Sequence, residues 1–231
     1  MSELLTGGAV WGVLLTLGAF ALGSFLQKKA RQAWCNPLLL GSLFVILFLR
    51  LLQIPYPDYQ ASAAPVSYLL LPATVSLAVP LYEQWEALRE NAAAILSGIA
   101  AGAAVSVGAI LVLAWAFRMD RAAAVSLLPK SVTTAIGADV SGELGGIPTL
   151  TTAVIILTGI FGNLSAQAVC RLFRIEDPVA KGVGIGTASH AIGTARALEI
   201  GPVEGAMSSL SIAVAGIMTA LLCPLAVDLL P

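Results

Sequence analysis

The feature that most constrains this chain is a series of apolar runs, each about as long as a membrane crossing. A helix needs roughly 20 apolar residues to span a bilayer, and a helix suits lipid because it satisfies its own backbone hydrogen bonds. The runs therefore predict an all-α polytopic membrane protein. They cover residues 9–26, 37–52, 92–117, 150–170 and 205–229, with a weaker run at 122–138 that Pro129 and Lys130 interrupt.

Composition supports the same class. Charged residues make up 11% of the 231 residues and hydrophobic residues 58%, whereas soluble domains carry about 25% charged residues. A net charge of −1 without a basic cluster gives no indication of nucleic-acid binding. The apolar run at 9–26 is long enough to span, and Lys28, Lys29 and Arg31 follow it, so it is predicted to be a retained helix rather than a signal peptide.

The sequence predicts no metal site, no cofactor and no enzymatic activity. Cys35, Cys170 and Cys223 are widely separated, and the single histidine, His190, is far from them in sequence. Ser189 precedes His190 directly, and adjacent residues of a helix do not face each other, so the pair is not a catalytic dyad. The phosphate-binding loop of ATP-driven proteins is not found in the sequence.

Two further stretches, 65–82 and 178–196, are broken by proline or glycine, and they correspond under a shift of 113 residues. This shift places Thr74 over Thr187 and Ser76 over Ser189, and it also superimposes the neighbouring apolar runs. The chain is therefore predicted to hold two repeats, 1–117 and 118–231, within a single membrane domain.

The basic residues predict how these repeats are oriented. Cytoplasmic loops carry an excess of Lys and Arg, and the cationic loops are 27–36, 118–121 and 171–181. All three lie inside if both broken stretches dip into the membrane and return on one side. The result is six crossings plus two re-entrant segments, with inverted repeats, a plan that recurs in secondary transporters. The alternative is that either broken stretch crosses fully as a kinked helix.

The first candidate site is the stretch from Lys181 to Arg196, which is rich in glycine and hydroxyl side chains. Glycine-rich backbone beside a helix N-terminus presents N–H groups to an anion, Arg grips carboxylates, and His190 titrates near neutral pH. These residues suit a small organic anion moved together with a proton. The alternative is structural: the glycines permit close helix packing, and His190 bonds a backbone carbonyl.

The second candidate is the stretch 128–134, where Lys130 lies within an apolar run beside Pro129. A charge at membrane depth is costly unless it is paired or wet, which makes it a candidate for function. The alternative is that Lys130 snorkels to the interface. The full set of predicted substrate-binding residues is Lys130, Ser131, Thr133, Thr134, Asn163, Thr187, Ser189, His190, Thr194 and Arg196, with Thr74 and Ser76 completing the cavity by pseudo-symmetry.

Several strings in the second half carry a resemblance to a known family. They are P-K-S-V-T-T at 129–134, E-L-G-G-I-P at 143–148, D-P-V-A-K-G at 177–182, G-T-A-S-H-A-I-G-T-A-R-A-L-E at 186–199 and E-G-A-M-S-S-L at 204–210. On these strings the chain resembles the LrgB/CidB membrane protein family. Asp139 departs from the pattern, because it is polar where an apolar helix is expected.

The resemblance implies a multi-pass protein of the bacterial inner membrane, often paired with an LrgA/CidA-type membrane partner. The family is described as antiholin- or holin-like, in control of murein hydrolase activity and lysis. Plant plastid relatives export glycolate and glycerate, and some bacterial relatives are linked to pyruvate uptake. We therefore predict a secondary transporter of small monocarboxylates that forms a homo-oligomer. The alternative prediction is a holin- or antiholin-like protein that controls permeability by oligomerising.

Overall fold

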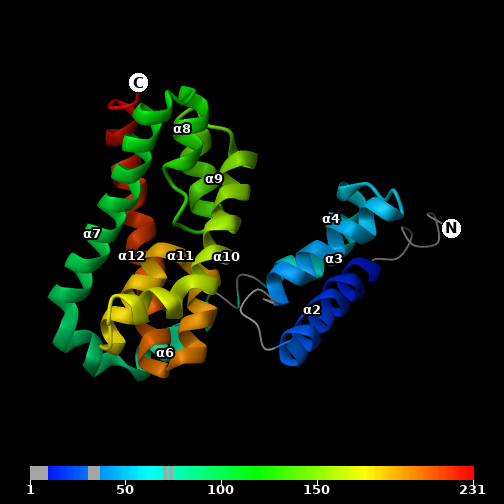
Figure 1. The fold of residues 1–231 in the computed structure, drawn as a ribbon, viewed down its shortest axis with the longest axis horizontal. Helices are drawn as coiled ribbons and strands as arrows, with labels where there is room; N and C mark the ends of the chain where they lie inside the picture. The colour runs from blue at the N-terminus through cyan, green and yellow to red at the C-terminus, as the bar shows by residue number, and fades with distance from the viewer. Residues whose placement is uncertain (1–9, 31–36, 70–71, 73–74, 77) are drawn as a thin grey trace. The chain divides into compact units, whose positions relative to one another are not determined.

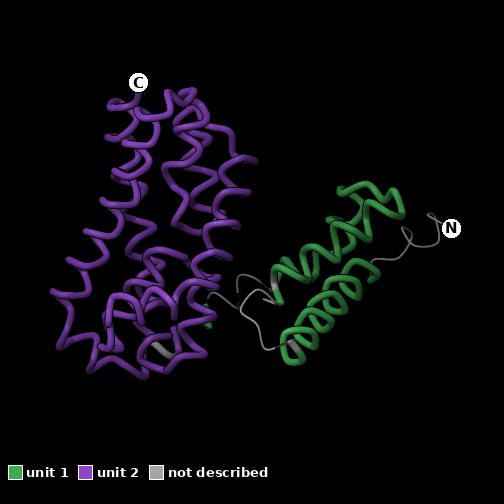
Figure 2. The backbone as a smooth tube through the Cα atoms, in the orientation of Figure 1, with its two compact units in different colours: residues 1–76 green, residues 77–231 purple. Residues whose placement is uncertain are grey.

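The structure is a computed structural model that describes residues 10–30, 37–69, 72, 75–76 and 78–231. Regular secondary structure in these residues is entirely α-helical, as the apolar runs predicted. The chain divides into two compact units, residues 1–76 and 77–231 (Figures 1 and 2). The boundary between the two units, after residue 76, differs from the predicted boundary between the two repeats, after residue 117. The units therefore do not test the repeats, which stay a prediction.

Unit 1 consists of α2 (Trp11–Ala30), α3 (Pro37–Leu51) and α4 (Tyr56–Tyr68), with α2 packed against both other helices. Gly12 lets α2 approach α4, because a methyl group there would lie 2.8 Å from the backbone nitrogen of Ala63. The Thr16 and Tyr59 hydroxyls then meet at 2.8 Å. Helix α4 takes up most of the interval between the apolar run that ends at 52 and the broken stretch that begins at 65, and it continues past Pro65.

Unit 2 holds the longer helices and the site. Helices α10, α11 and α12 each begin at a proline, which suits the first helical position because its missing N–H has no partner there. The elements in chain order are α6 (Ala78–Glu83), α7 (Trp85–Phe117), α8 (Arg121–Leu127), α9 (Thr134–Glu143), α10 (Pro148–Leu172), α11 (Pro178–Ile200) and α12 (Pro202–Val227) (Figure 1). Helix α7 starts seven residues before the predicted run at 92, so it takes in most of the polar stretch 83–91 as well.

Within the described residues, α7, α10 and α12 are long and apolar enough to cross a membrane. Helix α3 is a shorter apolar helix. The membrane character of the chain is thereby confirmed, whereas six crossings, the two re-entrant segments and the inverted repeat stay predictions. At the 113-residue offset, α3 corresponds in chain order to α10, and α7 to α12.

The apolar core of unit 2 forms where α7 and α12 pack together. One cluster joins Val107 and Ala114 of α7 to Val125 of α8 and Cys223 of α12. A second cluster joins Ile95 and Ile99 of α7 to Val183 of α11 and Met207 of α12. One face of α11 is therefore buried against α7 and α12, while the opposite face, which includes Gly184 and Ala188, is exposed.

Glycines bring α11 directly onto the backbone of α12. A methyl group at Gly182 would lie 2.5 Å from the carbonyl oxygen of Glu204, and one at Gly186 would lie 2.8 Å from Cα of Ser208. Small residues at such spacing allow helices to pack backbone to backbone in membranes. The structural role predicted for the glycines is thus present in the fold.

Two breaks in unit 2 fall where the sequence placed them. Between α8 and α9 the chain turns at Pro129 and Lys130, because proline lacks the N–H that continues a helix. Helix α11 is broken at His190, whose φ of 43° and ψ of −144° are not helical. Of the other broken stretch, 65–82, the structure describes the end of α4, residues 72 and 75–76, and most of α6.

Candidate functional site

The break in α11 is centred on His190, which is buried against α10. Its Nε2 lies 3.0 Å from the backbone carbonyl oxygen of Ile155. Gly159 makes room for the ring, because a methyl group there would lie 2.7 Å from Cε1 of His190. A carbonyl only accepts hydrogen bonds, so Nε2 carries a proton and Nδ1 is the nitrogen that gains or loses one. This contact matches the structural alternative, and it leaves Nδ1 available for proton transfer.

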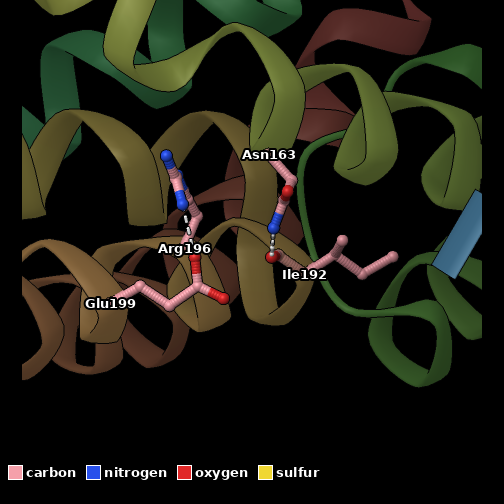
Figure 3. A network of polar contacts seen from close by, with 4 residues as sticks. All are labelled: Asn163, Ile192, Arg196 and Glu199. Atoms are coloured by element: carbon pink, nitrogen blue, oxygen red, sulfur yellow. Dashed lines mark hydrogen bonds and ion pairs between the residues drawn. The ribbon is translucent and has the colours of Figure 1, made fainter. Parts of the chain in front are cut away.

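Side chains from neighbouring helices bond the backbone around the break. Thr194 donates to the carbonyl of His190 at 3.0 Å, and its hydroxyl meets that of Ser208 on α12 at 2.7 Å. Asn163 on α10 donates to the carbonyl of Ile192 at 2.8 Å (Figure 3). Irregular backbone at membrane depth requires such partners, so Thr194 and Asn163 have positioning roles at the break.

Two further predicted residues, Ser189 and Thr187, lie immediately before the break. Ser189 packs against Gly162 of α10 and lines a cavity of about 180 Å³. The Thr187 hydroxyl is buried and has no hydrogen-bond partner among the described residues. The methyl carbon of Thr187 faces Gly102 of α7, where an added Cβ would lie 2.7 Å from it. A buried hydroxyl without a partner is costly in a protein, and it can bond a ligand.

Lys130 is held at the break between α8 and α9 by two hydroxyl groups. Its Nζ donates to Ser106 of α7 and to Ser131, each at 3.0 Å, and the two hydroxyl oxygens are themselves 3.0 Å apart. Residues on both sides of Lys130 are fully buried, including Leu128 and Val132. Within the described residues the one ion pair joins Arg196 to Glu199, so the charge of Lys130 is not balanced by a carboxylate there.

Helix α7 brings the two candidate stretches to one region. Gly102, which contacts Thr187, lies one helical turn before Ser106, which binds Lys130. Residues four apart share a helix face, about 6 Å along the axis. The sequence predicted both stretches but not their junction, and Ser106 was missed because its partner is 24 residues away. The sequence did contain a signal for Ser106, because its hydroxyl follows Gly102 by one helical turn within an apolar run.

No side-chain hydrogen bond connects the remaining predicted residues of unit 2 to this junction within the described residues. Arg196 pairs with Glu199 on its own helix, as Figure 3 shows, so its guanidinium already has an anionic partner. Thr133 is half-buried at the start of α9, and Thr134 is exposed. Ser76 is an exposed residue of unit 1 that donates to the carbonyl of Pro72 at 2.8 Å, and Thr74 lies outside the described residues. The contribution of Thr74 and Ser76 to the cavity stays a prediction.

A second set of buried hydroxyls, which sequence reasoning missed, connects α8, α9 and α10. The Thr151 hydroxyl donates to Ser141 at 2.7 Å, and Ser126 accepts from the backbone nitrogen of Ile147 at 2.7 Å. These three hydroxyl residues are fully buried. No group of three metal-ligating side chains occurs in the part of the chain that the structure describes.

Comparison with known proteins identifies the family. A model of the LrgB-like family matches residues 16–229. An antiholin-like protein LrgB of Bacillus subtilis is 34% identical over 95% of this chain and 96% of its own length. Proteins of the same description from Bacillus mycoides and Bacillus cereus are 33% identical over 93% of this chain and 94% of theirs. No solved structure is significantly similar. The family resemblance carried by the sequence strings is confirmed, and this chain belongs to the LrgB-like family.

Proposed function

We propose that this protein carries small monocarboxylates of the glycolate, glycerate and pyruvate class across the bacterial inner membrane, as a secondary transporter. The observation that carries the proposal is the ammonium group of Lys130, which two neutral hydroxyls bind and no described carboxylate balances. A charge at membrane depth needs a partner or water. A small carboxylate that reaches Lys130 supplies the missing negative charge.

The surrounding residues support binding and release of such an anion. Thr187 offers an unpartnered hydroxyl one turn of α7 away from the Lys130 contact. His190 keeps its Nε2 proton on the carbonyl of Ile155 and has Nδ1 free to take a second proton. In alternating access, the broken elements move relative to the long helices and expose the bound anion to each side in turn.

The comparisons favour a second function, and they favour it more directly than transport. The relatives carry the name antiholin-like protein. The second candidate is therefore a membrane protein that controls murein hydrolase activity and lysis, by oligomerising or by binding an LrgA/CidA-type partner. This function needs no selective anion site and predicts permeability changes that extend to unrelated solutes.

The experiment that separates the two functions is uptake into proteoliposomes that contain the purified protein. Labelled glycolate and pyruvate are supplied with and without a pH gradient, and an enclosed dye reports leakage. Transport predicts saturable uptake that responds to the gradient while the dye is retained. Dye leakage, or uptake that does not saturate, refutes the carrier and supports the antiholin-like function.

His190→Gln is expected to separate the structural role of the histidine from its proton role. The glutamine amide can still donate to the carbonyl of Ile155, but it cannot take a proton. We expect thermal stability to stay near that of the parent, while uptake loses its response to the pH gradient. His190→Ala, which removes both functions, is the comparison variant. Undiminished gradient-driven uptake by His190→Gln would show that this histidine is purely structural.

A further inference from the structure

We propose that Arg171, Arg174 and Lys181 form an anion-binding site at the mouth of a passage that leads to Ser189. This inference rests on the proposed transport function and names where the carboxylate first binds. The three cations line a cleft of about 310 Å³ between the end of α10 and the start of α11. Sites for small molecules have volumes from about 300 Å³ upwards, so the cleft is large enough for a small organic acid.

The charge of the cleft is positive and unpaired. Glu176 is the one carboxylate among its lining residues. The neighbouring Asp177 caps α11, with its side chain accepting from the backbone nitrogen of Ala180 at 2.8 Å. Within the described residues, none of the three cations is in an ion pair. They are therefore free to bind an anion from solution.

Arg174 stands in a backbone conformation that suits glycine better than arginine. Its φ is 51°, in the left-handed region. Helix α10 ends there, with the backbone nitrogen of Ile175 donating to the carbonyl of Cys170 at 2.8 Å. Glycine is the usual residue at this position of a helix end. Arg174 lines the cleft from this helix-end position, where a glycine would supply no charge.

The cleft adjoins the cavity that reaches the break in α11. Cys170, Ile175 and Lys181 line both spaces. The second cavity continues between Gly162 of α10 and Gly184 of α11, and it ends at Ser189, the residue before His190. The two spaces are therefore adjacent, and together they extend from the charged residues at the end of α10 to the residue before the break in α11.

The lining of the cleft fits a short hydroxy or keto acid. The cations bind the carboxylate, and Arg can do so through two parallel hydrogen bonds. Gln167 offers an amide to a hydroxyl or keto oxygen, while Ile175 and Ile200 contact a short carbon chain. A monocarboxylate of two or three carbons satisfies all three kinds of contact.

The test measures binding of glycolate and pyruvate to the purified protein in neutral detergent, by thermal stabilisation over a concentration series. Arg174→Gly and Lys181→Gln are each expected to raise the dissociation constant about tenfold, because each removes a charged hydrogen bond. The matched control is Arg118→Gly. Arg118 also has left-handed φ, 48°, at the end of a helix, and it lies in another loop predicted to be cytoplasmic, but it does not line the cleft.

Both Arg→Gly variants lose one positive charge and one strained residue, so both are expected to melt at a higher temperature than the parent without ligand. Only Arg174→Gly should bind the acids more weakly. Equal weakening in Arg118→Gly would mean a general effect of charge and would overturn the proposal. No stabilisation of the parent by either acid would also overturn it. If phosphatidylglycerol stabilises the parent through Arg174 and the acids do not, the site binds lipid and the proposal fails.

Uptake measured on the same preparations keeps this proposal separate from the transport function. If the parent protein binds the acids through Arg174 and Lys181 but does not transport them, the proposed binding site is supported and the transport function is refuted. If the parent protein transports the acids, and Arg174→Gly and Lys181→Gln bind them as tightly as the parent does, the proposed binding site is refuted and the transport function is supported.

Discussion

Gly186→Ala is expected to destabilise this protein by about 2 kcal/mol, because extra atoms in a tightly packed interface cost about 1–3 kcal/mol. The added methyl group would meet the backbone of Ser208, including its Cα at 2.8 Å. Backbone atoms cannot rotate away as a flexible side chain can, so α11 and α12 must separate. Separation also weakens the hydrogen bond between Thr194 and Ser208, which supports the break at His190.

Gly184→Ala provides the matched control. Gly184 lies two residues away on the same helix, and an added Cβ there has no neighbour within 4 Å. Alanine favours helix over glycine by about 1 kcal/mol, so this variant should be slightly more stable than the parent. Thermal unfolding of the three proteins in one detergent measures both effects. Equal melting temperatures for the two variants would show that α11 and α12 do not pack backbone to backbone at Gly186.

The helical class and the positions of the interruptions were predictable because they depend on local chemistry. Apolar runs of bilayer length require helices, and Pro129 and the glycines around His190 weaken a helix wherever it lies. The start of α7 at Trp85 was not predicted, because the residues before position 92 are largely polar and the apolar run does not extend to them. Polar residues extend a helix readily when its end projects beyond the apolar region.

The candidate site was predictable as two polar stretches, but its partners were not. Periodicity indicates which residues share a helix face, not which faces of different helices meet. The bonds of Lys130 to Ser106 and of His190 to the carbonyl of Ile155 depend on that packing. Arg196 illustrates the same limit, because Glu199 lies three residues further along α11 and pairs with it.

Lys130→Met is expected to lower uptake of small monocarboxylates at least about tenfold while it raises thermal stability. Lys130 is half-buried in the turn between α8 and α9. A lysine at membrane depth costs up to about 2.5–3.5 kcal/mol, and methionine fills a similar volume without a charge. The hydroxyls of Ser106 and Ser131 can still bond each other, at the 3.0 Å that already separates them. A gain in stability with a loss of function is the pattern expected of a charge kept for binding rather than for folding.

The measurement compares saturable uptake into proteoliposomes with melting temperature in detergent, for the parent, Lys130→Met and Lys29→Met. Lys29 is an exposed residue in the last turn of α2, so the same substitution there should change neither quantity appreciably. We expect uptake by Lys130→Met to fall at least about tenfold, as loss of a charged contact implies. If Lys130→Met transports as well as the parent, the charge has no part in binding the anion. The site must then be sought at Thr187, whose unpartnered hydroxyl lies at the same junction, or at Ser189, which lines the cavity between α10 and α11.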